Sequence, residues 1–132
     1  MSLQTWAAEF YPEPAEAAAK RGEAAAVEHS LRKWEGLKAE NLDRHDVGAG
    51  SRAIYDGRTD QGLSLGGENC ALCELRLEES CRICPLYKAR DCFACDRRRP
   101  DEGFSPWNSW TDDRDPEPMI FWLKKAKEHC ND

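Results

Sequence analysis

The sequence predicts a small α-rich domain stabilised in its middle by an irregular, metal-stapled cysteine module of the zinc-knuckle type. Three observations support this fold class. Six of the seven cysteines lie between residues 70 and 95, the segments on both sides are rich in helix-forming residues, and only 40% of the 132 residues are hydrophobic. Because such a composition gives a thin core, metal ligation would supply part of the stability. We expect residues 1–132 to form a single domain.

The N-terminal part of the chain, residues 3–38, is predicted to be helical. Apolar residues at its start recur with the spacing of one helix face: Leu3, Trp6, Ala7 and Phe10. Residues 13–37 are rich in the strong helix formers Ala, Glu, Lys and Arg. Gly22 marks a kink or a break among them, because glycine costs about 1 kcal/mol against alanine in a helix. The narrow apolar stripe of Val27, Leu31 and Trp34 predicts that this helix faces the core.

Residues 43–69 differ from the helical part because glycine recurs through them. Only two stretches, 52–55 and 63–65, have the composition of strands. We therefore expect a turn-rich segment with at most one short β-hairpin before the cysteines.

The cysteine module, residues 62–100, contains three C-x-x-C pairs separated by two spacers of seven residues each. Its predicted metal ligands are Cys70, Cys73, Cys81, Cys84, Cys92 and Cys95. A C-x-x-C pair can direct both thiolates to one tetrahedral ion, so two pairs complete one Zn²⁺ shell. The chain shows neither a secretory signal nor a membrane-spanning stretch. We therefore expect a cytoplasmic protein, in which clustered C-x-x-C pairs stay reduced and bind metal. In a secreted, cleaved product the same cysteines would instead form three disulfides and leave one free thiol.

Three metal sites are compatible with six thiols. The first is one structural Zn²⁺ held by four of them, and the most compact set is Cys70, Cys73, Cys81 and Cys84. The second is a pair of zinc ions that share bridging thiolates. The third is an iron–sulfur cluster, for which residues 84–85 supply one C-P sequence of the ferredoxin type. His29 and His45 could complete a shell, but with six thiols available we expect each to be solvent-exposed or to cap a helix.

Basic residues crowd the end of the module: Lys88, Arg90, Arg97, Arg98 and Arg99. Beside Tyr87 and Phe93 they could contact phosphates and stack on bases, which makes a nucleic acid the alternative partner. Acidic residues lie among them, however, and the formal net charge of the chain is -6, which opposes a phosphate backbone. We therefore interpret this run as a solvated turn.

The C-terminal part is predicted to contain a loop and a helix. Residues 103–115 have the composition of a loop anchored by Trp107 and Trp110. Residues 115–130 predict the last helix, with Asp115 as its N-cap and Pro116 as its first helical residue. Its apolar stripe comprises Met119, Leu123, Ala126 and Cys130.

Neither terminal helix can bury its apolar stripe without packing against another helix. We expect Leu31 and Trp34 of the N-terminal part to pack against Met119 and Leu123. One of the two tryptophans at 107 and 110 would close the join beside the metal module. This packing would place the long N-terminal helix in the core rather than leave it as a free arm.

Short matches along the chain resemble a group of small cysteine-containing proteins encoded by bacteriophages and bacteria. They are EFYP at 9–12, LRKWEGL at 31–37, C-x-x-C at 70–73, C-x-x-C-P-L at 81–86, SPW at 105–107 and DPEPM at 115–119. The resemblance implies a prokaryotic or viral setting and no particular activity. Because the third C-x-x-C pair is less regular in that group, it also implies that Cys95, and after it Cys92, are the weakest candidate ligands.

No catalytic pattern accompanies the cysteines. The chain contains no H-E-x-x-H, deaminase, G-x-S-x-G or Walker sequence, and a site made of thiolates alone is closed and structural. We therefore expect a zinc-stabilised cytosolic interaction protein that binds or inhibits another protein. We do not expect an enzyme. The alternatives are a zinc-finger regulator that binds nucleic acid and an iron–sulfur or redox protein. We expect no membrane association.

Overall fold

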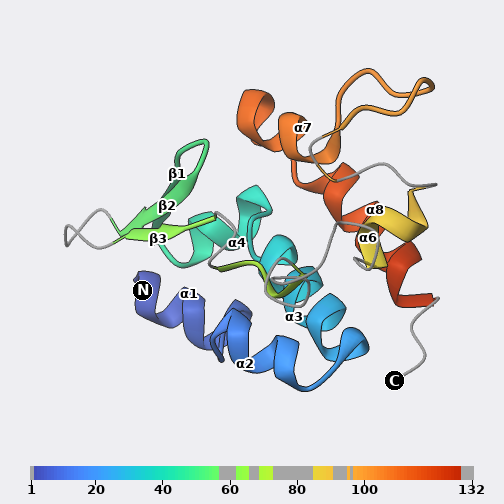
Figure 1. Ribbon diagram of the computed structural model, residues 1–132. Coiled ribbons are helices and arrows are strands. Elements are labelled where there is room, and N and C mark those ends of the chain that lie inside the picture. The colour runs from blue at the N-terminus through green and yellow to red at the C-terminus, as the bar shows by residue number, and fades with distance from the viewer. Residues whose placement is uncertain are drawn as a thin grey trace.

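The computed structural model describes residues 2–56, 62–65, 69–72, 85–90, 95 and 97–128. The helices in these ranges are α1 (Leu3–Phe10), α2 (Ala15–Lys20), α3 (Glu23–Glu35), α4 (Ala39–Arg44), α6 (Pro85–Ala89), α7 (Pro106–Asp113) and α8 (Glu117–Glu128). The strands are β1 (Val47–Ala49), β2 (Ala53–Asp56) and β3 (Gly62–Ser64). Helix α3 lies in the middle, with α1 and α2 on one side, α6 and α8 on the other, and the sheet beyond α4 (Figure 1). The prediction of a small α-rich fold is confirmed.

Helix α1 follows the predicted spacing and buries its apolar face. A capping box begins the helix, in which the Ser2 hydroxyl accepts from the Thr5 amide and the Thr5 hydroxyl accepts from the Ser2 amide. The fully buried Trp6 indole donates to the carbonyl oxygen of Gly36 at 2.8 Å. This hydrogen bond ties α1 to the end of α3.

The predicted helical stretch 13–37 is divided at Gly22, as its sequence indicated. Gly22 has φ 112° and precedes α3 as its N-cap, a conformation that favours glycine. Helix α2 therefore ends before this residue and α3 begins after it at Glu23. The break lets α2 fold back along α3, with which it is in contact.

The prediction of at most one β-hairpin is wrong by one strand. Strands β2 and β3 form the expected hairpin, with Ile54 opposite Leu63, but β1 also pairs with β2 and completes a three-stranded antiparallel sheet. Residues 47–49 read VGA and lack a run of β-branched or aromatic residues. Their strand conformation depends on the pairing with β2, which no local pattern indicates. Asp56, at the end of β2, accepts a hydrogen bond from the Leu3 amide at 3.0 Å and joins the sheet to the start of α1.

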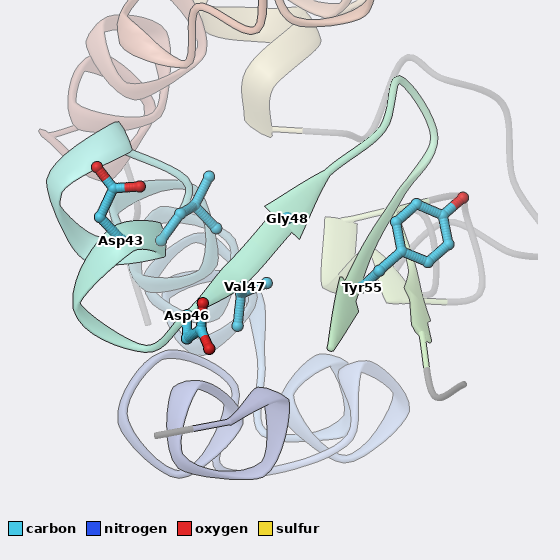
Figure 2. A pocket seen from close by; sticks show the side chains of 6 residues that line it. Asp43, Asp46, Val47, Gly48 and Tyr55 are labelled. Atoms are coloured by element: carbon cyan, nitrogen blue, oxygen red, sulfur yellow. The ribbon is translucent and has the colours of Figure 1, made fainter. Parts of the chain in front are cut away.

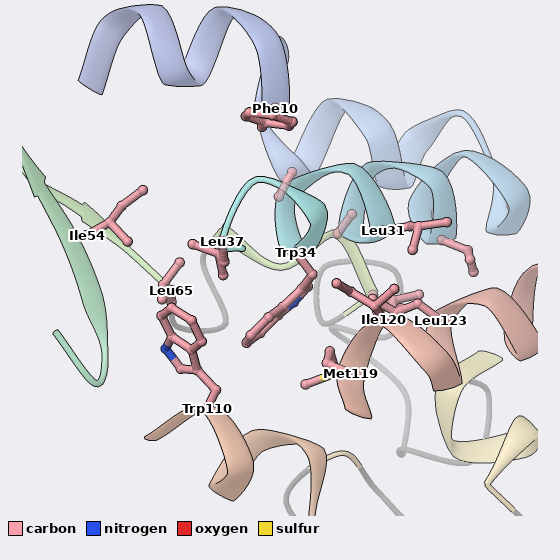
Figure 3. Packing of buried hydrophobic residues seen from close by; sticks show 14 of the residues in the cluster. Phe10, Leu31, Trp34, Leu37, Ile54, Leu65, Trp110, Met119, Ile120 and Leu123 are labelled. Carbon is pink, nitrogen blue, oxygen red and sulfur yellow. The ribbon is translucent and has the colours of Figure 1, made fainter. Parts of the chain in front are cut away.

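The predicted packing of α3 against α8 is confirmed (Figure 3). Leu31 and Trp34 share one buried cluster with Met119 and Leu123 of α8. Both nearby tryptophans close the join, because the Trp34 ring meets the rings of Trp107 and Trp110 edge to face, at centroid distances of 6.2 and 5.6 Å. Cys130 lies outside the described residues.

The predicted loop at 103–115 is wrong, since eight of its residues form helix α7. The Ser105 hydroxyl accepts from the Asn108 amide at 3.2 Å, and Pro106 occupies the first turn. A serine N-cap followed by proline is a helix-start signal, but the many Gly, Ser, Pro, Asn and Asp residues of the segment favour a loop. Helix α8 is capped by Asp115, whose carboxylate accepts from the Glu117 amide at 3.1 Å.

Among the helices of the described ranges, none has the length and apolar composition needed to cross a membrane.

Candidate functional site

Two of the six predicted metal ligands fall in the described part of the chain. Cys70 and Cys95 are both half-buried and pack against the hydrophobic core. The carbonyl oxygen of Cys95 accepts a hydrogen bond from the Trp107 amide at 3.0 Å, which attaches the end of the module to α7. The first and last cysteines of the module are therefore both seated on the core.

The other four predicted ligands, Cys73, Cys81, Cys84 and Cys92, lie outside the described residues. Within the residues that are described, no three His, Cys, Asp or Glu side chains group as metal ligands would. Because most of the predicted shell falls elsewhere, the metal site stays a prediction.

Helix α3 carries a buried polar cluster, one member of which contacts the residue before Cys70. The cluster consists of His29, Ser30 and Lys33, all of them buried. Lys33 is 1% exposed, and its ammonium donates to the carbonyl oxygen of Asn69 at 2.9 Å. Asn69 precedes Cys70 and is itself held from two sides. The side-chain oxygen of Asn69 accepts a hydrogen bond from the Tyr11 hydroxyl at 2.8 Å, and its side-chain nitrogen Nδ2 donates to the carbonyl oxygen of Ser64 at 2.8 Å.

His29 belongs to this cluster as a neutral ring. Its Nε2 lies 2.8 Å from the carbonyl oxygen of Glu13. Because a carbonyl only accepts hydrogen bonds, Nε2 carries a proton and donates in this contact, and in the neutral ring that burial favours Nδ1 is the acceptor nitrogen. Burial lowers the pKa of His29 below its ordinary value of 6.5, and the charge of Lys33 adds to this effect, although the bond to Glu13 opposes it. In the described part of the chain, Nδ1 has no hydrogen-bond partner.

The expectation that both histidines are solvent-exposed or capping is wrong for His29. It is partly met for His45, which is the C-cap residue of α4 but is also buried. The ring of His45 contacts Thr5 Oγ1 at 3.0 Å and Glu9 Oε1 at 2.9 Å, so it links α4 to α1. Helix α3 is covered on more than one side, which is why it buries polar positions together with its apolar stripe.

The basic residues at the end of the module are organised around Glu102. Arg90 has no exposed surface and forms a bidentate ion pair with the Glu102 carboxylate at 2.9 and 3.0 Å. It also donates to the carbonyl oxygen of Arg97. The guanidinium groups of Arg90 and Arg99 lie 5.3 and 4.9 Å from the ring centroid of Trp122.

Glu102 is held in its charged form by these neighbours. Its burial alone would raise the pKa of the carboxyl, but hydrogen bonds from Arg90, from the Arg99 amide and from Trp122 bring the pKa below its ordinary value. The Arg99 amide donates to Glu102 at 2.7 Å. Sequence reasoning missed the role of Glu102 because no helix or strand spacing relates it to Arg90.

The interpretation of the basic residues as a solvated turn is wrong for Arg90, which is buried. Arg90 cannot contact a phosphate because its guanidinium has no surface in contact with solvent. Arg97 and Arg98 are exposed, and Arg98 donates to the carbonyl oxygen of Glu102 at 2.8 Å. The Lys88 side chain lies outside the described part of the structure. The exposed basic surface contributed by Arg90, Arg97, Arg98 and Arg99 is therefore smaller than their number suggests.

A hollow of about 350 Å³ lies where α4 meets the sheet (Figure 2). Its lining residues come from α4, from the turn after it and from β1 and β2: Leu42, Asp43, Asp46, Val47, Gly48 and Tyr55. Tyr55 is 52% exposed. In the register of the sheet it lies opposite Gly48 on one side and Gly62 on the other, so no side chain from those two positions covers it. The hollow thus combines two carboxylates with an open aromatic ring.

The sequence analysis did not identify this hollow. Its aspartates occur in the segment DRHDVG, residues 43–48, whose pairing with β2 was not predicted. Comparison of the chain with protein-family models, with curated proteins and with solved structures gave no match. The resemblance to small phage and bacterial cysteine-containing proteins therefore stays an expectation.

Proposed function

We propose that this chain is a metal-stabilised interaction protein, acting in the cytoplasm of a bacterium or of a phage-infected host, that binds a basic segment of another protein. The hollow beside α4 carries this proposal. It offers Asp43 and Asp46 to lysine or arginine side chains of that segment, and the exposed Tyr55 suits a cation–π contact with a further basic side chain of the same segment. The net charge of -6 favours the approach of a basic partner.

In this proposal a structural Zn²⁺ bound by cysteines of the module stabilises the domain and takes no part in binding. Two observations support it. Cys70 and Cys95 are both seated on the core, and clustered C-x-x-C pairs are typical of closed zinc sites. When bound, the ion would supply a crosslink between the cysteine segment and the helices on which those two residues pack.

The rival function, nucleic-acid binding through the basic run, has less support. The burial of Arg90 against Glu102 removes one of its five cations from the surface. Both functions can be tested with the same protein, because phosphate contacts make affinity fall steeply with salt.

The test measures binding of a fluorescent peptide of alternating arginine and alanine to the full chain with zinc present. We expect the double variant Asp43→Asn, Asp46→Asn to bind at least about tenfold more weakly, because it loses two charged acceptors. The matched control is Asp112→Asn, Asp113→Asn, which removes the same two charges from exposed positions of α7 and is expected to bind like the parent.

Two results would contradict the proposed binding function. One is equal loss of affinity in both double variants, which would reduce the effect to net charge. The other is failure of the parent to bind the peptide while it binds single-stranded DNA with a strong salt dependence, which would favour the rival function.

A further inference from the structure

Tyr55 differs from the aromatic residues of the helices in what surrounds its ring. The tryptophans and phenylalanines of α1, α3, α7 and α8 each contact another ring or a cation. Among the residues that the structure describes, none stacks on the Tyr55 ring or forms a hydrogen bond with its hydroxyl. About half of this residue is exposed, so an aromatic surface is left open beside the two aspartates of the hollow.

Two glycines fix the place of the Tyr55 ring on the sheet. A Cβ atom added at Gly62 would lie 3.2 Å from Tyr55 Cδ1, and one added at Gly50 would lie 3.0 Å from Tyr55 Cε2. Both distances are shorter than an ordinary contact between carbon atoms. The ring therefore occupies space that side chains at these two positions would need, and it has a defined place between two stretches of backbone.

Gly48 is glycine for a different reason. It lies in β1 opposite Tyr55 and lines the hollow. Beyond its chain neighbours, a Cβ atom there would meet only the Tyr55 carbonyl oxygen, at 4.0 Å, and its φ is not in the left-handed region. Glycine inside a strand weakens it and often marks a place where a ligand approaches the backbone. The space over Gly48 is thus open to a partner, between the aspartates and Tyr55 (Figure 2).

We propose that the basic segment crosses β1 over Gly48 and that Tyr55 selects an arginine in it. This inference rests on the proposed binding function and names the side chain that the site prefers. One basic side chain pairs with the carboxylates of Asp43 and Asp46, and an arginine further along the segment lies flat on the Tyr55 ring. A guanidinium is planar and more weakly hydrated than an ammonium, so it stacks on an exposed ring at a smaller loss of hydration. Lysine suits the carboxylates but gains less from the ring.

The experiment compares two fluorescent peptides of equal length on the full chain with zinc present. One alternates arginine with alanine and the other alternates lysine with alanine. We expect the parent to bind the arginine peptide about fivefold more tightly. Tyr55→Phe, which keeps the ring, should preserve this ratio of affinities, and Tyr55→Leu should bring it close to one. The matched control is Phe104→Leu, which removes a ring of similar exposure outside the hollow and should leave the ratio unchanged.

Gly48→Val tests the path of the segment across β1. Valine suits a strand, and its side chain would enter the hollow, where the added Cβ atom has room. We expect both peptides to bind at least about tenfold more weakly, while the melting temperature stays at that of the parent or rises. A Gly48→Val chain that binds both peptides as the parent does would show that the segment does not cross β1 and would overturn the inference.

The outcomes separate this inference from the proposed function. A parent that binds neither peptide overturns the proposed function and this inference with it. A parent that binds both peptides with equal affinity keeps the proposed function and overturns the preference for arginine. A preference that Tyr55→Leu retains overturns the role of Tyr55. Thermal melts establish that each variant folds, and Tyr55→Thr, which suits a strand, replaces Tyr55→Leu if the leucine variant does not.

Discussion

At the scale of single residues, charged side chains form contacts between helices. Glu9 on α1 is an example, because it accepts hydrogen bonds from the Arg44 guanidinium at 2.8 and 2.7 Å and contacts the buried His45 ring at 2.9 Å. The hydrogen bond from Arg44 and, to a smaller extent, that from His45 lower the pKa of Glu9 to about 2. The carboxylate therefore connects α1 to the end of α4.

The lowered pKa of Glu9 predicts an acid-sensitive contribution to stability. Because the folded pKa of about 2 lies below the ordinary 4.5, the contribution is fully present above pH 4.5 and is lost as the pH falls towards 2. We expect Glu9→Gln to melt below the parent at neutral pH, and the difference between their melting temperatures to shrink across that window. Thermal melts at a series of pH values measure this difference.

The control for this prediction is Glu16→Gln, whose ion pair with Lys20 is largely exposed and contributes little. Its melting temperature should stay close to that of the parent at every pH. A gap between Glu9→Gln and the parent that keeps its size down to pH 2 would show that the carboxylate charge is not what stabilises the contact.

At the scale of elements, α1 and the end of α3 approach each other closely at Gly36. A Cβ atom added at Gly36 would lie 2.5 Å from Cγ and 2.7 Å from Cβ of Phe10. These atoms are near the backbone of α1 and have little freedom to move. The φ of Gly36 is -66°, which any residue adopts, so the requirement for glycine is one of space.

This close approach predicts that Gly36→Ala is destabilising. The added methyl must push α1 away from α3 and disturb the bond between the Trp6 indole and the Gly36 carbonyl. We expect a loss of about 1–3 kcal/mol in the free energy of unfolding, as for other overpacked sites. Denaturant titration measures it.

The matched control is Gly103→Ala, because a Cβ atom there would have nothing within 4 Å. It should leave the unfolding free energy unchanged. A Gly36→Ala chain as stable as this control would mean that α1 is free to move outward at no cost.

At the scale of the whole molecule, stability is proposed to depend on both the helical core and the metal. The core joins α1, α3, α7, α8 and the sheet in one buried cluster. Cys70 and Cys95 pack against that cluster from the two ends of the cysteine segment. A metal held by this segment would therefore stabilise the contacts on either side of it.

Cys70→Ser tests the metal at this scale. We expect about one equivalent of zinc in the parent and loss of most of the zinc in the variant. Its melting temperature should fall strongly, because structural zinc supplies roughly 10 kcal/mol or more of binding free energy in small domains. Metal analysis and thermal melts measure the two effects, and the visible spectrum separates colourless zinc–thiolate from a brown iron–sulfur cluster.

Cys130→Ser is the control, since this cysteine lies outside the three C-x-x-C pairs. It should keep the zinc. A Cys70→Ser chain that retains both its metal and its melting temperature would remove Cys70 from the ligand set.

Sequence reasoning predicted the elements whose signal is local. The spacing of Leu3, Trp6 and Phe10 identified α1, the glycine at 22 identified the break before α3, and the stripe from Met119 to Leu123 identified the face of α8 that packs on Trp34. Each of these signals is carried by neighbouring positions of one helix. Helix α7 also has a local signal, its serine–proline start, but the loop-like composition of the segment around it predicts a loop instead.

The sequence by itself determined most of the helices, the α-rich class and the spacing of the cysteines, because these depend on residues that are close together in the chain. Only the tertiary structure decided that Lys33 and Arg90 are buried and that Asp43, Asp46 and Tyr55 share one hollow. The buried Arg90 pairs with Glu102, which is distant in the chain, and the buried Lys33 donates to the carbonyl oxygen of Asn69. The hollow forms where β1 pairs with β2 beside α4. Burial depends on which distant segments cover a residue, and no local period encodes that covering.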